Sequence, residues 1–284
     1  MINPILGPIA VIAPSSAFDP DKLAVGLAMA REQGLDVQPL PNLLDPVRTL
    51  AHSDAHRAAQ LIEALTSDRY GAVWMVRGGY GLTRILDRLD GVSLPPRPIL
   101  GFSDVTALFA ALHPRGVGPL IHAPMPHSLA SNDAESQAHL WDLVAGRPTA
   151  PMSGTEWVAG EADGPLVGGN LTMLATLCGT PWQLDASGSI LVLEDVGEYP
   201  YRLDRALQQI SSAGGFDGVA GIALGEFSNC WAPEGADWTL DDVLLDHLGP
   251  LGVPIVADLP IGHGTRNLAF VWGETARLHQ GTLR

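Results

Sequence analysis

The first half of the chain alternates short apolar runs with amphipathic segments. Apolar runs at 9–13, 71–76 and 98–102 are typical of strands buried in a parallel sheet. Between the first two runs, apolar residues recur at helical spacing over 23–33 and 53–65, with a strand candidate at 35–40. Strands that alternate with helices at this pitch predict a parallel sheet covered by helices on both faces.

The helix ends carry matching signals. Ser53 suits an N-cap, and the apolar face that follows it comprises Ala58, Leu61, Ile62 and Leu65. Gly34 suits the residue just after a helix. A short helix through Arg88 and a longer one over 132–145 complete this half.

The pattern changes near residue 146. Glycine and proline are frequent over 146–169 and periodicity is weak, as in a connection between domains that contains short strands near Trp157 and Val158. We therefore expect an N-terminal α/β domain over 1–150, a linker over 151–165 and a C-terminal domain over 166–284. In that second domain the pattern predicts helices at 170–178, 201–210 and 240–248, strands at 189–194, 219–224 and 254–256, and a pair of tail strands at 268–272 and 275–278.

The composition limits the classes of partner that this chain is expected to bind. The 284 residues are 46% hydrophobic, enough for a large core, and carry a net charge of −15. That charge disfavours nucleic acid and anionic membranes, because their phosphates would be repelled. The two cysteines, Cys178 and Cys230, form no disulfide framework or zinc pattern. No apolar run approaches the about 20 residues of a membrane helix, and the start lacks the basic residues of a secretory signal, so a cytoplasmic protein is expected.

Ser103 stands where a predicted strand gives way to a helix. A serine at such a turn has an exposed hydroxyl, next to the free N–H groups of the helix start. That arrangement presents a nucleophile together with part of an oxyanion hole. The match to G-x-S-x-G is incomplete, because Val105 replaces the second glycine. The same residues also suit an ordinary helix cap.

Two further residues complete a possible triad. Glu194 ends one predicted strand, and His263 lies between two glycines near the end of another. A serine needs a base to take its proton, and a histidine needs a carboxylate to fix its tautomer. Glu194 could equally cap the next helix, and His263 could be a turn residue. The flanking glycines would allow a ligand to approach the backbone around His263 closely.

Other motifs bear on cofactors and metals. Gly78 and Gly79 follow a predicted central strand, where they could expose N–H groups to an oxyanion or simply form a tight turn. The chain contains no phosphate-binding glycine loop, so no nucleotide cofactor is expected. His122 and His127 lack further metal ligands, and we predict neither a metal site nor any other cofactor.

Together these stretches resemble the LD-carboxypeptidase family of serine peptidases, which includes muramoyltetrapeptide carboxypeptidases and microcin C self-immunity hydrolases. The resemblance covers nearly the whole chain. The matching segments are 13–16, 52–54 with Arg57, 77–81, 101–108, 168–171, 193–198 with Tyr201 and Arg202, and 262–264.

The resemblance implies roles for individual residues. Ser103 matches the nucleophile, with Phe102 where the family usually has tyrosine. Glu194 matches the triad carboxylate and His263 the general base. The oxyanion hole would consist of the backbone N–H groups of Gly79 and Asp104. Substrate contacts are expected at Arg77 and Asn170, although Arg77 could instead brace its loop.

The resemblance also implies a fold and a substrate. The expected fold is α/β, with an N-terminal flavodoxin-like parallel sheet domain and a smaller, β-rich C-terminal α/β domain, in a homodimer. The expected substrate is a peptidoglycan tetrapeptide that loses its terminal D-Ala. The alternatives are a peptidyl nucleotide, whose base would need an aromatic surface such as Trp182 or Trp231, a muropeptide-binding protein without catalysis, or a flavodoxin-like cofactor protein, which the missing phosphate loop disfavours.

Overall fold

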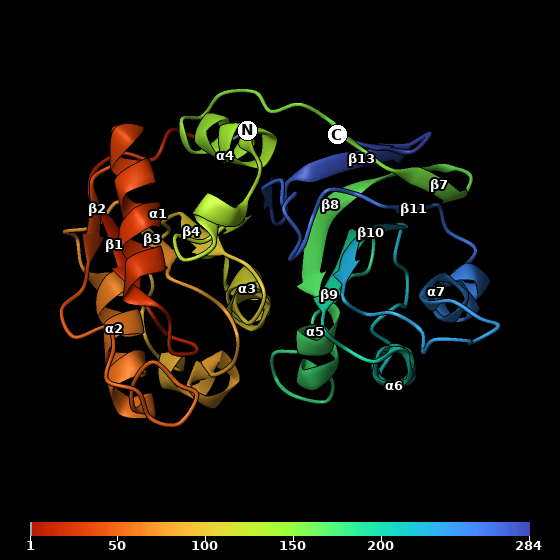
Figure 1. Cartoon of the computed structure of the whole chain (residues 1–284), viewed down its shortest axis with the longest axis horizontal. Helices are drawn as coiled ribbons and strands as arrows, with labels where there is room; N and C mark the ends of the chain where they lie inside the picture. Colours follow the sequence, from red (N-terminus) through yellow and green to blue (C-terminus); the bar gives the residue numbers. More distant parts are fainter. Residues whose placement is uncertain (1) are drawn as a thin grey trace. The chain divides into compact units, whose positions relative to one another are not determined.

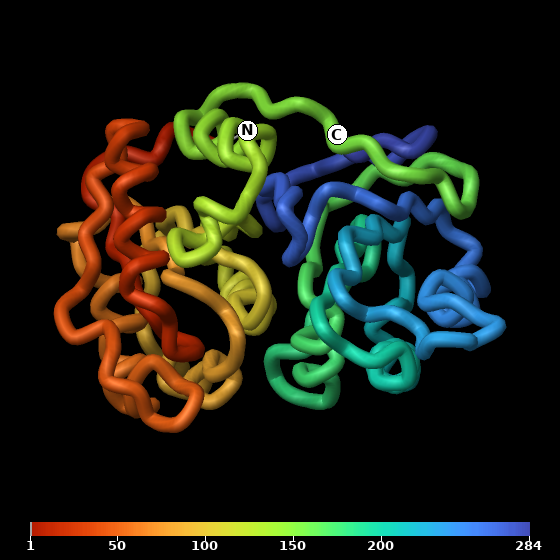
Figure 2. Tube along the Cα trace, in the orientation of Figure 1, coloured from red at the N-terminus to blue at the C-terminus, as the bar shows by residue number. Residues whose placement is uncertain are grey.

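The computed structural model describes residues 2–284, which divide into two compact units (Figure 1). The first unit holds the chain as far as Thr149 together with Leu268–Val271. The second holds Ala150–Asn267 together with Trp272–Arg284. The chain can be followed through both units in Figure 2, where the passage at 149–150 is green and the return to the first unit at 268–271 is blue.

The first unit contains a six-stranded sheet in the order β2-β1-β3-β4-β5-β12. The first five strands in this order are parallel to their neighbours, and β12 is antiparallel to β5. The order 2-1-3-4-5 is that of flavodoxin-like folds, so the predicted fold of this half is confirmed. The strands are β1 (Ile9–Ile12), β2 (Val37–Pro39), β3 (Ala72–Met75), β4 (Ile99–Gly101), β5 (Leu120–His122) and β12 (Phe270–Val271).

Helices connect these strands. As predicted, the Ser53 side chain caps a helix by accepting a hydrogen bond from the N–H of His56. The short helix expected through Arg88 is instead a pair of 3-10 turns, because Gly81 and Ile85 interrupt the regular dihedral angles. The helices of this unit are α1 (Pro20–Glu32), α2 (Asp54–Thr66), α3 (Val105–Leu112) and α4 (Ala134–Val144), with 3-10 turns η1 (Leu82–Arg84), η2 (Leu86–Leu89), η3 (His113–Arg115) and η4 (Leu129–Ser131).

The second unit is built on an eight-stranded mixed sheet, in the order β6-β14-β13-β8-β9-β10-β11-β7. Its four central strands are parallel, and antiparallel strands flank them on both sides. The central strands are β8 (Glu161–Asn170), β9 (Ile190–Val196), β10 (Gly221–Ser228) and β11 (Ile255–Ala257). The flanking strands are β6 (Met152–Ser153), β7 (Thr155–Val158), β13 (Thr275–His279) and β14 (Thr282–Leu283).

The helices of the second unit are α5 (Leu171–Leu177), α6 (Pro200–Ser212) and α7 (Leu240–Leu248), followed by the 3-10 turn η5 (Gly249–Leu251). Helix α6 packs between α5 and α7. The α/β class and the richness in β-structure predicted for the second half are both confirmed.

Two local expectations differ from the structure. The stretch 151–165, expected as a linker, carries β6, β7 and the first residues of β8. The short strand expected near Trp157 and Val158 is β7, whereas β6 and the start of β8 are short or half-exposed and carry no apolar pattern in the sequence. The tail strands do not pair with each other: β12 joins β5, and β13 joins β8 and β14. Gly273, at φ +79°, separates β12 from β13, and each strand pairs with a strand that is distant in the sequence.

Candidate active site

Ser103 lies in a strained turn at the carboxyl end of β4. Its φ is +65°, a left-handed conformation that costs a non-glycine residue about 1–2 kcal/mol. Helix α3 begins two residues later, and its first turn is closed by the Thr106 N–H donating to the Ser103 carbonyl at 2.9 Å. Strain of this kind concentrates at functional sites, because the turn projects a side chain that a relaxed backbone would not. A turn of this kind can present the Ser103 hydroxyl, and the role of Ser103 as nucleophile stays a prediction.

The glycines after β3 pack directly against this turn. A Cβ atom on Gly78 would lie 2.6 Å from the Cβ and 2.7 Å from the Oγ of Ser103. Gly79 has φ +98°, and a Cβ there would lie 2.4 Å from the Oγ of Ser16. Side chains at either position would push the two loops apart, so the structure requires glycine at both.

The backbone N–H groups proposed for the oxyanion hole are available. Across residues 2–284, neither the N–H of Gly79 nor that of Asp104 donates a hydrogen bond. The Asp104 carboxylate is fully buried and accepts a hydrogen bond from the N–H of Leu82 at 2.9 Å. Burial raises the pKa of this carboxyl group, and the bond from Leu82 partly offsets the rise. Asp104 therefore ties the Ser103 turn to the loop that carries Gly79.

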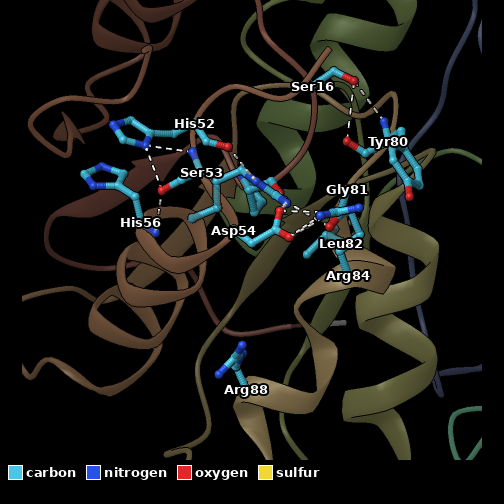
Figure 3. A network of polar contacts seen from close by, with 12 residues as sticks. Ser16, His52, Ser53, Asp54, His56, Tyr80, Gly81, Leu82, Arg84 and Arg88 are labelled. Carbon is cyan, nitrogen blue, oxygen red and sulfur yellow. Dashed lines mark hydrogen bonds and ion pairs between the residues drawn. The ribbon is translucent and has the colours of Figure 1, made fainter. Parts of the chain in front are cut away.

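A network of polar contacts holds the same loop from the other side (Figure 3). The N–H of Tyr80 donates to the Oγ of Ser16 at 3.0 Å. Arg57 is fully buried and donates to the carbonyl oxygens of Gly81, at 3.0 Å, and of Pro14. The Arg57 guanidinium is in turn paired with Asp54 at 2.6 Å. The sequence marked Arg57 only as part of a matching segment, since nothing local shows that its guanidinium is buried under this loop.

Asp54 also pairs with Arg84 in this network. The hydrogen bonds from Arg84, and then those from Arg57, outweigh the opposing effect of burial and lower the pKa of Asp54 from 3.8 to about 2. Because the folded-state pKa is depressed, the stabilisation is present above pH 3.8 and is lost as the pH falls toward 2.

We expect Asp54→Asn to lower the thermal midpoint at neutral pH, and the difference from the wild type to shrink as the pH falls from 3.8 toward 2. Thermal unfolding followed by circular dichroism over this range measures the effect. Asp87→Asn is the matched control, because Asp87 and its neighbour Arg88 are both exposed, at 3.8 Å from each other. A difference between Asp54→Asn and wild type that stays constant down to pH 2 would contradict the assignment.

Arg77 lies beside Gly79, in a corner where the charges of Lys22 and Asp19 also act on His127. Its guanidinium donates to the Ala17 carbonyl at 2.6 Å, and burial lowers its pKa. The pKa of the His127 imidazole is lowered mainly by burial. The nearby charges of Arg77 and Lys22 lower it further. Arg77 thus braces the loop, one of the two roles considered for it, while its substrate contact stays a prediction.

In the second unit, Glu194 and His263 form a hydrogen-bonded pair. Glu194 belongs to β9 and its side chain is fully buried; the His263 side chain is 17% exposed. The Nδ1 of His263 lies 2.7 Å from the Oε2 of Glu194. Because an ionised carboxylate only accepts hydrogen bonds, Nδ1 carries the proton in the neutral ring and Nε2 is left able to accept one. An imidazole in this tautomer can act as a general base.

The environment of His263 also sets its proton affinity. Burial by itself would lower the pKa of the imidazole. The charge of Glu194 and its hydrogen bond act in the opposite direction and prevail, with smaller contributions from Asp195 and Glu226, so the pKa of His263 is raised. The imidazolium form is therefore stabilised, as a base that carries a proton through a reaction requires.

The glycines that flank His263 have a specific explanation. A Cβ on Gly262, at φ +136°, would lie 3.2 Å from the Oε2 of Glu194. A Cβ on Gly264 would lie 1.8 Å from a carboxylate oxygen of Glu226. The sequence suggested approach by a ligand, whereas the groups that approach here are two carboxylates of the same chain. Glu226 belongs to no motif in the sequence; its position near the end of β10, beside the end of β9, was the signal that could have identified it.

Asn170 has a structural role in this unit. Its Oδ1 caps α5 by accepting from the N–H of Met173, and its Nδ2 donates to the Oδ1 of Asp195 at 3.0 Å. Asp195 also accepts bonds from the N–H and hydroxyl groups of Thr172. Burial raises the pKa of Asp195, and the adjacent charge of Glu194 adds to that rise. The substrate contact expected of Asn170 stays a prediction.

Each unit thus brings together its own part of the predicted site. Ser103, Asp104 and Gly79 are assembled in the first unit, and Glu194 and His263 in the second. Within residues 2–284, no three His, Cys, Asp or Glu side chains are grouped so as to hold a metal ion. In the same range, no helix has the length and apolar character needed to cross a bilayer.

Comparison with known families identifies both halves. Residues 9–123 match the LD-carboxypeptidase N-terminal domain, and residues 163–278 match the LD-carboxypeptidase C-terminal domain. The chain belongs to the LD-carboxypeptidase family. This LD-carboxypeptidase is 37% identical, over 99% of its length and 96% of the relative's, to the murein tetrapeptide carboxypeptidase of Pseudomonas aeruginosa. The family assignment makes it a serine-type carboxypeptidase.

Solved structures agree with this assignment. The LD-carboxypeptidase is similar to the muramoyltetrapeptide carboxypeptidase from Oxalobacter formigenes, with a TM-score of 0.80, 29% identity, and coverage of 96% of this chain and 97% of that one. It also shares the fold of MccF in complex with glutamyl sulfamoyl guanosine, with a TM-score of 0.84, 15% identity, and coverage of 99% and 97%.

Proposed function

We propose that this LD-carboxypeptidase cleaves the amide bond before the terminal D-Ala of peptidoglycan tetrapeptides by acyl transfer to Ser103. The observation that carries the proposal is the 2.7 Å hydrogen bond between Glu194 and Nδ1 of His263. This bond keeps the proton of the neutral imidazole on Nδ1, so that Nε2 can accept the serine proton. The relatives named for murein tetrapeptides and muramoyltetrapeptides support the substrate class. A role in cytoplasmic murein recycling and a homodimeric state belong to the same proposal.

The reaction follows from the roles of these groups. Ser103 Oγ attacks the carbonyl carbon before D-Ala while its proton passes to Nε2 of His263. The N–H groups of Gly79 and Asp104 stabilise the oxyanion, each contributing about 3 kcal/mol to lowering the barrier. Collapse of the intermediate breaks the C–N bond, and His263 donates the proton to the departing amine. Water then attacks the ester, again with His263 as base, and the acid product and the Ser103 hydroxyl are released.

The terminal carboxylate of the substrate requires a cationic partner. The corner formed by Arg77 and Lys22 beside His127 supplies positive charge near Gly79 in a chain whose net charge is −15. A guanidinium can hold a carboxylate through two parallel N–H···O bonds, although one of its N–H groups is already used on Ala17. This corner supports specificity for an exopeptidase substrate.

Mass spectrometry of a muropeptide tetrapeptide, incubated with the wild type or with Ser103→Ala, tests the function. We expect the wild type alone to remove one alanine. Removal by both proteins would contradict the proposed nucleophile. An intact tetrapeptide with the wild type would contradict the proposed substrate; a peptidyl nucleotide, assayed in parallel, then tests the alternative drawn from the microcin hydrolases. Binding of the tetrapeptide without cleavage by the wild type would indicate a binding protein.

A further inference from the structure

A cavity of about 550 Å³ lies in the second unit, beside β10, β11 and α7. Part of its lining is apolar and buried, including Leu224, Leu244 and Leu259, each at most 2% exposed. The lining residues also include Trp231, which is 69% exposed, and Trp238, which is 39% exposed. A concave site of this size with exposed indoles has the usual character of a small-molecule pocket.

The charged groups that line this cavity are mostly carboxylates. Glu226, Asp241 and Asp258 contribute three negative charges, against the single guanidinium of Arg266. Burial raises the pKa of Asp241, and the charge of Asp258 raises it further. Asp241 and Asp258 are therefore close enough to repel each other, and a positive charge placed between them would relieve that repulsion.

We propose that this cavity, here termed the indole–carboxylate pocket, binds an organic cation: an ammonium or guanidinium group attached to a small apolar body. Tryptophan is the aromatic residue that attracts cations most strongly through its ring face. The carboxylates add charge complementarity, and the buried leucines accommodate the apolar body. Anionic ligands such as nucleotides are disfavoured, because their phosphates would face three carboxylates.

The pocket adjoins the loop of the candidate base. Thr265 and Arg266 line it, and Glu226, another lining residue, is one of the charges that raise the pKa of His263. A cation bound here could therefore be a separate ligand, or the side-chain amine of the third residue in a peptide substrate. The second source rests on the proposed function, whereas binding of the cation itself does not.

Choline is a suitable probe, and 3,3-dimethylbutanol is its neutral isostere. We expect choline to quench the tryptophan fluorescence saturably, with an affinity at least about tenfold above that of the isostere. Trp231→Ala and Asp241→Asn should each weaken choline binding by about tenfold or more. Trp182→Ala and Asp246→Asn are the matched controls, because neither residue lines the pocket.

Equal affinity for choline and its isostere would overturn the proposal, and so would full retention of choline binding by both Trp231→Ala and Asp241→Asn. Calorimetric titration of the same proteins with choline and with its isostere checks the result independently of the fluorescence of Trp231. Because neither measurement involves turnover, failure here is distinct from failure of the proposed peptidase reaction.

A kinetic comparison identifies the source of the cation. Tetrapeptides with lysine or with norleucine as the third residue differ only by the amine. If Asp241→Asn raises KM for the lysine peptide alone, the pocket holds the substrate's amine. If KM is unchanged for both peptides while choline binding is lost, the pocket holds a separate cationic ligand. Either result is compatible with the pocket and decides its occupant.

Discussion

Ser103→Ala is expected to lower kcat for tetrapeptide hydrolysis by a factor on the order of 10⁶, the scale found when a serine nucleophile is removed from a triad. The physical reason is that no other group in the turn can form the ester intermediate. The N–H groups of Gly79 and Asp104 would stay in place, so a small residual rate above the uncatalysed reaction should persist. Release of D-Ala, followed by mass spectrometry or a coupled assay, measures the change.

The matched control is Ser128→Ala. Ser128 lies in the same unit, and its hydroxyl donates to the Met125 carbonyl at 3.2 Å, so the variant removes a serine hydroxyl outside the candidate site. It should retain wild-type kcat. Circular dichroism and the thermal midpoint of Ser103→Ala should match those of the wild type within a few degrees. A folded Ser103→Ala variant with activity within tenfold of wild type would rule out Ser103 as the nucleophile.

Glu194→Gln is expected to lower kcat by about 10⁴-fold, as for the loss of the orienting carboxylate in other triads. An amide that directs its N–H toward Nδ1 favours the imidazole tautomer with the proton on Nε2, which cannot accept the serine proton. The same change removes the main group that raises the pKa of His263, while burial, which lowers that pKa, remains. The variant should therefore show a second signature, in its pH dependence.

The direction of this change in pH dependence follows from the role of His263 as the general base. The free base must be neutral, so the wild-type kcat/KM should fall as the pH drops through the raised pKa of His263, above the usual 6.5. This fall of kcat/KM on the acidic side of the pH profile, the acidic limb, should move to lower pH in Glu194→Gln. Glu161→Gln is the control that should change neither kcat nor this pH dependence, because Glu161 is a half-exposed residue at the start of β8. An acidic limb left in place by Glu194→Gln would show that His263 is not the titrating base.

The amino-acid pattern by itself determined much of the fold. Uninterrupted apolar runs marked β1, β3 and β4, because strands buried on both faces of a parallel sheet are apolar throughout. Ser53 marked the start of α2, because a cap acts within one turn of chain. The candidate residues Ser103 and Glu194 could be found at strand ends for the same local reason.

Only the tertiary structure decided the features that depend on partners distant in the sequence. Strand β12 is two residues long and joins β5, about 150 residues earlier in the chain, which no local pattern specifies. The buried guanidinium of Arg57 and the approach of Glu226 to Gly264 are equally invisible to periodicity. Whether a glycine serves a turn, a ligand or a neighbouring carboxylate depends on what packs against it in three dimensions.

The chemistry divides in the same way. The sequence by itself determined which residue types were available, the apolar pattern that places them at strand ends, and the family resemblance that named Ser103, Glu194 and His263. The tertiary structure decided that Glu194 meets Nδ1 of His263, that Gly78 leaves room for the Ser103 turn, and that tryptophan and acidic residues line one pocket. The reason is that local sequence sets backbone conformation, whereas distances between side chains are set by how the elements pack.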